Sequence, residues 1–219
     1  MVWLCALLIL AYLLGSIPSA VWIGKLIKGI DIREYGSGNA GTTNAIRFLG
    51  LKNGIIVFII DFSKGFAAVF LSRIYTPDID NENFLLLFRF ALAFFAVIGH
   101  IFPVFAKFKG GKGIATLTGS TIALMPIPVL LCIMIFTIVF IISYTVSISS
   151  MIAAITLPIM CFIFARYTDT SHLIFSAIVA IIVIITHRNN IIRLLNGTEP
   201  KLNINIHNKR KQNNKKINE

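Results

Sequence analysis

Pro128-Val-Leu-Leu-Cys-Ile-Met-Ile-Phe-Thr-Ile-Val-Phe-Ile-Ile-Ser-Tyr-Thr-Val146 is the stretch that decides the fold class of this chain. It carries no charged side chain and has about the ~20 residues that an α-helix needs to cross a bilayer. The whole sequence agrees with it, because 57% of the 219 residues are hydrophobic and only 13% are charged. The mean hydropathy of +0.85 lies far outside the range of soluble domains. We therefore predict an all-α, polytopic integral membrane protein.

Outward from this stretch, six more apolar segments of helical length can be drawn, at Val2–Gly24, Gly54–Tyr75, Phe84–Phe105, Ile114–Met125, Ser149–Arg166 and His172–Thr186. They predict a bundle of about seven transmembrane helices, in which the short fourth segment crosses the bilayer incompletely. The first segment has no charged start and no small-residue cleavage site, so we expect a retained helix rather than a signal peptide. Residues 1–205 are predicted to form one transmembrane domain. The Asn- and Lys-rich residues 206–219 are predicted to be a disordered basic tail that anionic lipid attracts.

The net charge of +11 is distributed unevenly over the predicted loops. With seven spans, 16 of the 20 Lys and Arg residues fall on the side of the C-terminus, and two fall on the other side. Because basic residues accumulate on the cytoplasmic side, we expect the N-terminus outside and the C-terminus in the cytoplasm. No aromatic or folded platform accompanies the basic tail, so nucleic-acid binding is disfavoured.

Three polar stretches fall on the predicted cytoplasmic face. The first is Gly36-Ser-Gly-Asn-Ala-Gly-Thr-Thr-Asn-Ala-Ile-Arg47, with three glycines in six residues, short polar side chains and one guanidinium. Glycines permit positive φ and close approach of the backbone to a ligand, and Arg47 suits phosphate. The residues alone leave two interpretations open, an anion-binding loop and a flexible connector.

The second stretch, Gly99–Thr116, contains Gly110-Gly-Lys-Gly113 directly before a predicted helix. Free N–H groups at a helix N-terminus bind phosphate, and Lys112 adds a charge. The spacing of a nucleotide-binding P-loop is absent, so nucleotide hydrolysis is not supported. His100 could equally be a buried structural histidine or a catalytic one.

The third stretch, His187–Glu199, begins where the last apolar segment ends. In a helical continuation His187, Asn190 and Arg193 share one face, because they are spaced by three residues. Glu199 is either a solvated charge or the partner of a cytoplasmic cation.

Ionisable and metal-binding residues elsewhere predict little chemistry. Asp61 and Lys64 are three residues apart inside an apolar segment and predict an internal ion pair. A structural role is the preferred interpretation of this pair, and a functional role is the alternative. The three cysteines lie in apolar runs without a nearby His, so we expect packing residues rather than a disulfide or a metal site.

Taken together, the three stretches resemble the bacterial membrane glycerol-3-phosphate acyltransferase family that uses acyl phosphate as its donor. The resemblance extends from Gly15-Ser-Ile-Pro-Ser19 to Glu199 and includes Asp61-Phe-Ser-Lys-Gly65. It implies transfer of a fatty acyl group from acyl phosphate to the sn-1 hydroxyl of glycerol 3-phosphate, which yields lysophosphatidic acid and phosphate. It also implies a multi-pass protein of the bacterial cytoplasmic membrane, its active site on the cytoplasmic face. Membrane lipid and a soluble acyl-phosphate synthase are the implied partners, and no cofactor or metal is implied.

The resemblance assigns roles to residues of all three stretches. Those implied to be catalytic are Ser37, Arg47, Lys112, His187 and Asn190. Those implied to bind phosphate or substrate are Gly36, Gly38, Asn39, Thr42, Asn44, Gly110, Gly111, Gly113 and Thr116. Structural support is expected from Asp61, Lys64, His100 and Glu199. The base that removes the hydroxyl proton is either His187 or the phosphate of the substrate.

Two other functions were considered. An acyltransferase that uses acyl-CoA or acyl carrier protein would need a His–x4–Asp pair, and no histidine of this chain is followed by Asp at that spacing. A transporter of organic phosphates would explain the basic residues, but it would favour ionisable groups in mid-span and an internal repeat. The charges gather at one face and no repeat is visible, so the acyltransferase is the preferred hypothesis.

Overall fold

The computed structural model describes residues 2–75, 81–165 and 168–202, and the regular elements within them are all helical. In order these are α1 (Val2–Gly15), α2 (Ser19–Lys28), η1 (Ile32–Glu34), α3 (Thr42–Leu49), α4 (Leu51–Phe70), α5 (Ser72–Tyr75), α6 (Glu82–Ile101), η2 (Val104–Ala106), α7 (Ile114–Leu124), α8 (Pro126–Ser143), α9 (Val146–Ile163), α10 (Thr170–Thr186) and α11 (Arg188–Leu195). The predicted all-α fold is confirmed for this part of the chain.

The described residues contain five helical runs that are long and apolar enough to cross a membrane: Val2–Lys28, Leu51–Ile74, Glu82–Ala106, Pro126–Ser143 and Val146–Ile163. A sixth is obtained if α10 and α11, which meet at an angle of 59°, count as one broken span. Each of the seven predicted segments is helical, but α7, the fourth, has only 11 residues. The number of complete crossings therefore stays a prediction, and the predicted tail at 206–219 lies outside the described residues.

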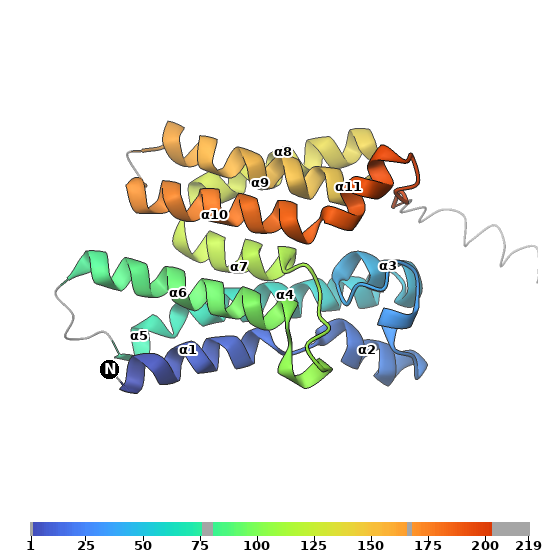
Figure 1. Cartoon of the computed structure of the whole chain (residues 1–219), viewed down its shortest axis with the longest axis horizontal. Helices are drawn as coiled ribbons and strands as arrows, with labels where there is room; N and C mark the ends of the chain where they lie inside the picture. The colour runs from blue at the N-terminus through green and yellow to red at the C-terminus, as the bar shows by residue number, and fades with distance from the viewer. Residues whose placement is uncertain (1, 76–80, 166–167, 203–219) are drawn as a thin grey trace, which may run out of the picture.

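The helices form two groups joined by α7 (Figure 1). In one group α9 packs between α8 and α10, and in the other α1, α4 and α6 contact one another. Because α7 contacts α4, α6 and α8, it connects the two groups. The short helices α2, α3 and α11 gather at one end of the bundle, beside the loop that leads into α7 (Figure 1).

Two glycines set the close contact between α4 and α7. A Cβ atom added at Gly65 would lie 2.0 Å from the carbonyl oxygen of Thr116, and one added at Gly119 would lie 2.0 Å from that of Phe62. Small residues let helices approach closely in lipid, where apolar side chains gain little from leaving the solvent. The two contacts fix α7 along α4 and so fix the position of its N-terminal end.

The first apolar segment is broken between α1 and α2, where Ser16, Ile17 and Pro18 interrupt the helix. The side chain of Lys64 on α4 reaches the break, and its Nζ donates to the carbonyl oxygen of Ile17 at 2.9 Å. A broken backbone within a membrane needs such a partner, because lipid offers none. The same Nζ lies 2.9 Å from Asp61 Oδ1, and both side chains are almost fully buried. The predicted ion pair is confirmed.

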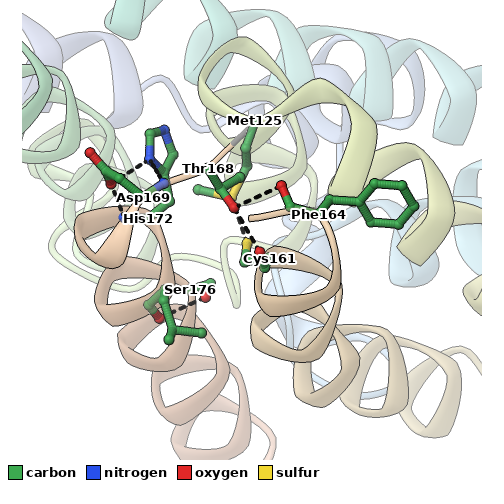
Figure 2. Close-up of polar contacts among 8 residues, drawn as sticks. Met125, Cys161, Phe164, Thr168, Asp169, His172 and Ser176 are labelled. Atoms are coloured by element: carbon green, nitrogen blue, oxygen red, sulfur yellow. Dashed lines mark hydrogen bonds and ion pairs between the residues drawn. The ribbon is translucent and has the colours of Figure 1, made fainter. Parts of the chain in front are cut away.

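Side-chain hydrogen bonds satisfy backbone groups at the C-terminal end of α9 and at the N-terminal end of α10 (Figure 2). Thr168 Oγ1 donates to the carbonyl oxygen of Cys161 at 2.6 Å, and Asp169 caps α10 by accepting from the backbone N–H of His172 at 3.0 Å. The thiol of Cys161 lies 3.5 Å from the sulfur of Met125. All three cysteines are free thiols, and Cys132 and Cys161 are buried, as expected of packing residues.

Candidate functional site

All three predicted polar stretches meet at one cavity of about 320 Å³, at the end of the bundle where α3 and α11 lie. Segments separated by more than a hundred residues thus contribute to a single site. The predicted residues that line it are Ser37, Asn39, Thr42, Asn44, Arg47, Asp61, His100, Lys112, Gly113, His187, Asn190 and Glu199. The lining does not include Gly36, Gly38, Lys64, Gly110, Gly111 or Thr116.

The first stretch folds into a tight loop that leads into α3. Gly36 and Gly38 adopt the left-handed φ values of 60° and 69°, which only glycine takes without strain. The carboxamide of Asn44 is buried and donates to the carbonyl oxygens of Ile32 and Tyr35, at 2.9 and 3.0 Å. Asn44 therefore shapes the loop, and its predicted contact with substrate stays a prediction.

Arg47 lies on α3 and turns its guanidinium towards the cavity. One of its terminal nitrogens donates to the carbonyl oxygen of Pro200, at 2.8 Å. A guanidinium has five N–H donors, so this single bond leaves most of them for an anion.

Lys112 precedes α7, and its ammonium donates to Oδ1 of Asn190 on α11. Burial lowers the pKa of Lys112 to about 8, with the neighbouring Arg193 and Arg47 acting in the same direction and Glu199 opposing them. The residue between Lys112 and the helix is Gly113, whose φ of 80° lets the chain turn into α7. The side chain is therefore a partly desolvated cation, which interacts with an anion more strongly than a hydrated one does.

The backbone amides of Gly110 and Gly111 both donate to carbonyl oxygens of the chain, and neither residue lines the cavity, so their predicted contact with phosphate stays a prediction. The N–H of Gly110 donates to the carbonyl oxygen of Ile101 at 3.2 Å, and that of Gly111 donates to His100 at 3.1 Å. Both glycines are needed for packing, because a Cβ at Gly110 would lie 2.0 Å from the carbonyl oxygen of His100. Thr116 is likewise buried, and its hydroxyl lies 3.2 Å from His100 Nδ1 rather than in the cavity.

His187 occupies the joint between α10 and α11, where the chain bends by 59° before the predicted helical continuation. Its Nδ1 lies 2.8 Å from the carbonyl oxygen of Val183. A carbonyl oxygen only accepts, so Nδ1 carries the proton and Nε2 keeps a lone pair. Burial, together with the charge of Lys112, lowers the pKa of His187 to about 4. The imidazole is therefore neutral near pH 7.

Glu199 pairs with the cation Arg193, which confirms one of the two predicted alternatives. Its carboxylate accepts from Asn190 Nδ2 at 2.6 Å, Ser147 Oγ at 2.7 Å and Arg193 Nε at 2.7 Å. Burial alone would raise the pKa of Glu199, but the hydrogen bonds outweigh it and lower the pKa. Glu199 pairs with Arg193, and among the described residues neither Arg47 nor Lys112 forms an ion pair with a carboxylate.

Several lining residues were not predicted, notably Ser147 and Ser150 on α9 and Pro200 and Leu202 after α11. The serines had a signal, because Ser147-Ile-Ser-Ser150 is a polar cluster at the start of an apolar segment. No sequence pattern indicated that Pro200 and Leu202 would line the cavity. They reach the cavity because the chain turns back after α11, where Leu202 N–H donates to the carbonyl oxygen of Tyr144 at 2.8 Å.

A second cavity of about 450 Å³ adjoins the first and is almost entirely apolar. The two share Phe58, Ile114, Phe136 and Ser150 as common walls. The second cavity extends between α4, α7, α8, α9 and α10, where its lining includes Leu117, Val129, Ala154, Leu157 and Val179. The pair of cavities fits an amphiphile with an anionic head and a long apolar tail.

Comparison with known proteins agrees with this geometry. The sequence matches the family model described as glycerol-3-phosphate acyltransferase over residues 5–197. The chain belongs to the glycerol-3-phosphate acyltransferase family. Its relatives in that family include the glycerol-3-phosphate acyltransferase of Chlorobaculum tepidum, which is 43% identical over 90% of this chain and 95% of its own. That of Listeria monocytogenes is 42% identical over 91% of this chain and 96% of its own.

Two solved structures of the same family have this fold. The crystal structure of PlsY (YgiH), an integral membrane glycerol 3-phosphate acyltransferase, in its glycerol 3-phosphate form has a TM-score of 0.80 and 37% identity over 91% of this chain and 96% of that one. Its lysophosphatidic acid form has a TM-score of 0.78 and 37% identity, with 91% and 95% of the chains covered. The helical membrane fold is therefore confirmed by similarity to experimental structures of acyltransferases.

Proposed function

We propose that this protein transfers a fatty acyl group from an acyl phosphate to the sn-1 hydroxyl of glycerol 3-phosphate. The products are lysophosphatidic acid and inorganic phosphate. One observation carries the proposal: a cavity with the cations Arg47 and Lys112 adjoins a mainly apolar cavity and shares lining residues with it. Crystal structures of a family member are described with glycerol 3-phosphate and with lysophosphatidic acid, which supports the same acceptor and product here.

The two cavities assign places to the parts of the substrates. Both substrates carry a phosphate, and Arg47 and Lys112 are the cations suited to bind them. Ser37 lies on the same lining and offers a hydroxyl to a phosphate oxygen. The acyl chain of the donor would enter the apolar cavity past Phe58 and Phe136, the walls that the two cavities share.

The reaction needs no covalent enzyme intermediate, because an acyl phosphate is already activated. The acceptor hydroxyl attacks the acyl carbon, a new C–O ester bond forms, and the bond from that carbon to the phosphate oxygen breaks. The hydroxyl proton goes to a base, and the neutral His187 with a free lone pair on Nε2 is the side-chain candidate. The rival base is a phosphate oxygen of the substrate itself. In either case Lys112 and Arg47 stabilise the charge of the departing phosphate.

The orientation in the membrane follows from charge. We place the protein in the bacterial cytoplasmic membrane, with its N-terminus outside and the cavity on the cytoplasmic side, because 16 of 20 basic residues lie on that side of the seven-span topology. This placement opens the polar cavity to the compartment of a soluble acyl-phosphate synthase, which would supply the donor.

The test is direct. Purified protein in detergent is incubated with a long-chain acyl phosphate and labelled glycerol 3-phosphate, and lysophosphatidic acid and phosphate are expected in equal amounts. Arg188→Ala serves as the matched control for Arg47→Ala, because Arg188 is an exposed arginine on the neighbouring α11 that does not line the cavity. No product with the wild-type protein, together with uptake of glycerol 3-phosphate into vesicles, would refute the acyltransferase and support a transporter.

A further inference from the structure

We propose that Asp61 is a substrate-binding residue, and that its Oδ2 accepts a hydrogen bond from the sn-2 hydroxyl of glycerol 3-phosphate, the hydroxyl that is not acylated. This assignment rests on the proposed function and adds a determinant of acceptor specificity to it. The sequence predicts an ion pair at this position, with a structural role as the preferred interpretation and a functional role as the alternative.

The donors around Asp61 all approach the same oxygen. Oδ1 accepts from Ser19 Oγ at 2.7 Å and from Lys64 Nζ at 2.9 Å, and His100 Nδ1 lies 3.6 Å away from it. These contacts hold the carboxylate in one orientation, and the ammonium of Lys64 keeps it ionised. The structural role of the pair is thus fulfilled by Oδ1 alone.

Oδ2 has no hydrogen-bond partner among the described residues, although Asp61 is only 1% exposed. An ionised carboxylate has about four acceptor positions, and a buried oxygen without a donor is unfavourable. A donor must therefore come from a molecule that enters the site. Asp61 is a lining residue of the polar cavity, which gives such a molecule its route.

The same cavity contains a second buried oxygen without a partner in the described structure, Oγ1 of Thr42 at the start of α3. A third such oxygen, Ser16 Oγ, belongs to a residue outside the lining of the cavity. Two of the three unpaired oxygens thus belong to residues that line the cavity where a polar substrate is expected. Ser16 provides the matched control, since it is equally buried and equally unpaired.

The chemistry of Asp61 selects a hydroxyl and rejects a phosphate. A carboxylate repels an anion, so the phosphate of the acceptor lies towards Arg47 and Lys112 while a hydroxyl proton meets Oδ2. Glycerol 3-phosphate has two hydroxyls, and anchoring the sn-2 hydroxyl leaves the terminal sn-1 hydroxyl to react. The contact therefore positions the acceptor at a third point, in addition to its phosphate and its reacting oxygen.

The test compares two acceptors with the wild-type enzyme. Glycerol 3-phosphate is compared with 3-hydroxypropyl phosphate, which keeps the phosphate and the primary hydroxyl but lacks the sn-2 hydroxyl. We expect kcat/KM to be at least about 100-fold lower for the analogue, because a site built to bind a hydroxyl discriminates strongly against its absence. A ratio within about threefold would overturn the proposal without any variant, since the donor to Oδ2 would then be water.

Asp61→Asn assigns the discrimination to this residue. The donors to Oδ1 keep the amide oxygen in that place, so an NH₂ group, which cannot accept, occupies the position of Oδ2. We expect kcat/KM for glycerol 3-phosphate to fall and the ratio between the two acceptors to shrink at least about tenfold, while Ser16→Ala keeps the wild-type ratio. If Asp61→Asn is not recovered folded because Lys64 has lost its partner, Asp61→Asn/Lys64→Gln replaces it.

Three other outcomes would overturn the assignment of Asp61 as a substrate-binding residue. A folded variant that loses activity equally on both acceptors, with an unchanged ratio, would show that Asp61 is only structural and would overturn the assignment. A ratio that shrinks equally in Ser16→Ala would also overturn it, because the effect would not depend on the cavity. If wild-type protein does not acylate glycerol 3-phosphate at all, the proposed function fails, and this assignment fails with it.

Discussion

The lowered pKa of Lys112 makes the affinity of the site for anions depend on pH. With a pKa of about 8, its ammonium is about nine-tenths charged at pH 7 and about one-tenth charged at pH 9. If only the charged form binds phosphate, kcat/KM for glycerol 3-phosphate falls about tenfold between pH 7 and pH 9. The phosphate of the substrate is already a dianion over this range, because its second pKa lies near 6, so the change belongs to the enzyme.

The perturbation is Lys112→Arg, which replaces the titrating ammonium with a guanidinium that stays charged. We expect lower activity at pH 7, because the fork cannot reproduce the contact of the ammonium with Asn190, but no decline up to pH 9.5. The assay is the initial rate of lysophosphatidic acid formation between pH 6 and pH 9.5, with blanks for hydrolysis of the donor. A flat wild-type profile, or the same decline in Lys112→Arg, would refute the reasoning.

Stability provides an internal check, because it changes in the opposite direction. Between pH 8 and pH 10.5 Lys112 is largely protonated in the unfolded chain but not in the folded protein, so the unfolded state binds more protons. Its contribution to the free energy of unfolding therefore rises with pH in this window. A fall in kcat/KM without a fall in thermal stability would separate titration at the site from loss of the fold.

Three further predictions concern other parts of the two cavities. Arg47→Ala should lose at least about 100-fold in kcat/KM, measured as labelled product, while Arg188→Ala stays near wild type, because Arg47 lines the cavity and Arg188 does not; activity of Arg47→Ala within a few-fold of wild type would remove Arg47 from the site. His187→Gln should lower kcat by about 100-fold or more with little change in the binding constant of glycerol 3-phosphate, if Nε2 is the base; near-normal turnover would instead assign that role to the substrate phosphate. Ala154→Phe should fill part of the apolar cavity and shift the preferred donor to shorter acyl chains, as judged by competing acyl phosphates; an unchanged chain-length profile would show that the acyl chain lies elsewhere.

The long helices were predictable because each of them is a run of apolar residues, a pattern that lipid imposes on any spanning helix. All seven predicted segments are helical, and the Asp61–Lys64 ion pair followed from their spacing on one helix. The exact ends were less predictable. The first segment was predicted to end at Gly24, but α2 continues to Lys28, because the chain resumes a helix after the break at Ser16–Pro18.

The site residues with ionisable or polar side chains could be predicted from the sequence. The features that depend on backbone packing could not. Lys112, His187 and Asn190 were predicted because their side chains can bind a phosphate or transfer a proton, and all three line the cavity. The packing role of Gly110 and Gly111 was not predicted, because a glycine that lets two backbones approach looks the same in sequence as one that binds an anion. The bend at His187 and the return of residues 199–202 to the cavity depend on tertiary contacts, such as the bond between Arg47 and Pro200, which no local pattern encodes.

The wall shared by the two cavities has a consequence for how the reaction is completed. Phe58 and Phe136 stand where an aqueous compartment for ions meets a compartment for hydrocarbon, so the ester bond would be made at the boundary of two phases. A water-soluble acceptor enters on one side, and after acylation its new tail already lies in the other. In that sense the protein acts as a phase-transfer catalyst: release of phosphate to water and of lysophosphatidic acid to lipid would separate the products and oppose the reverse reaction.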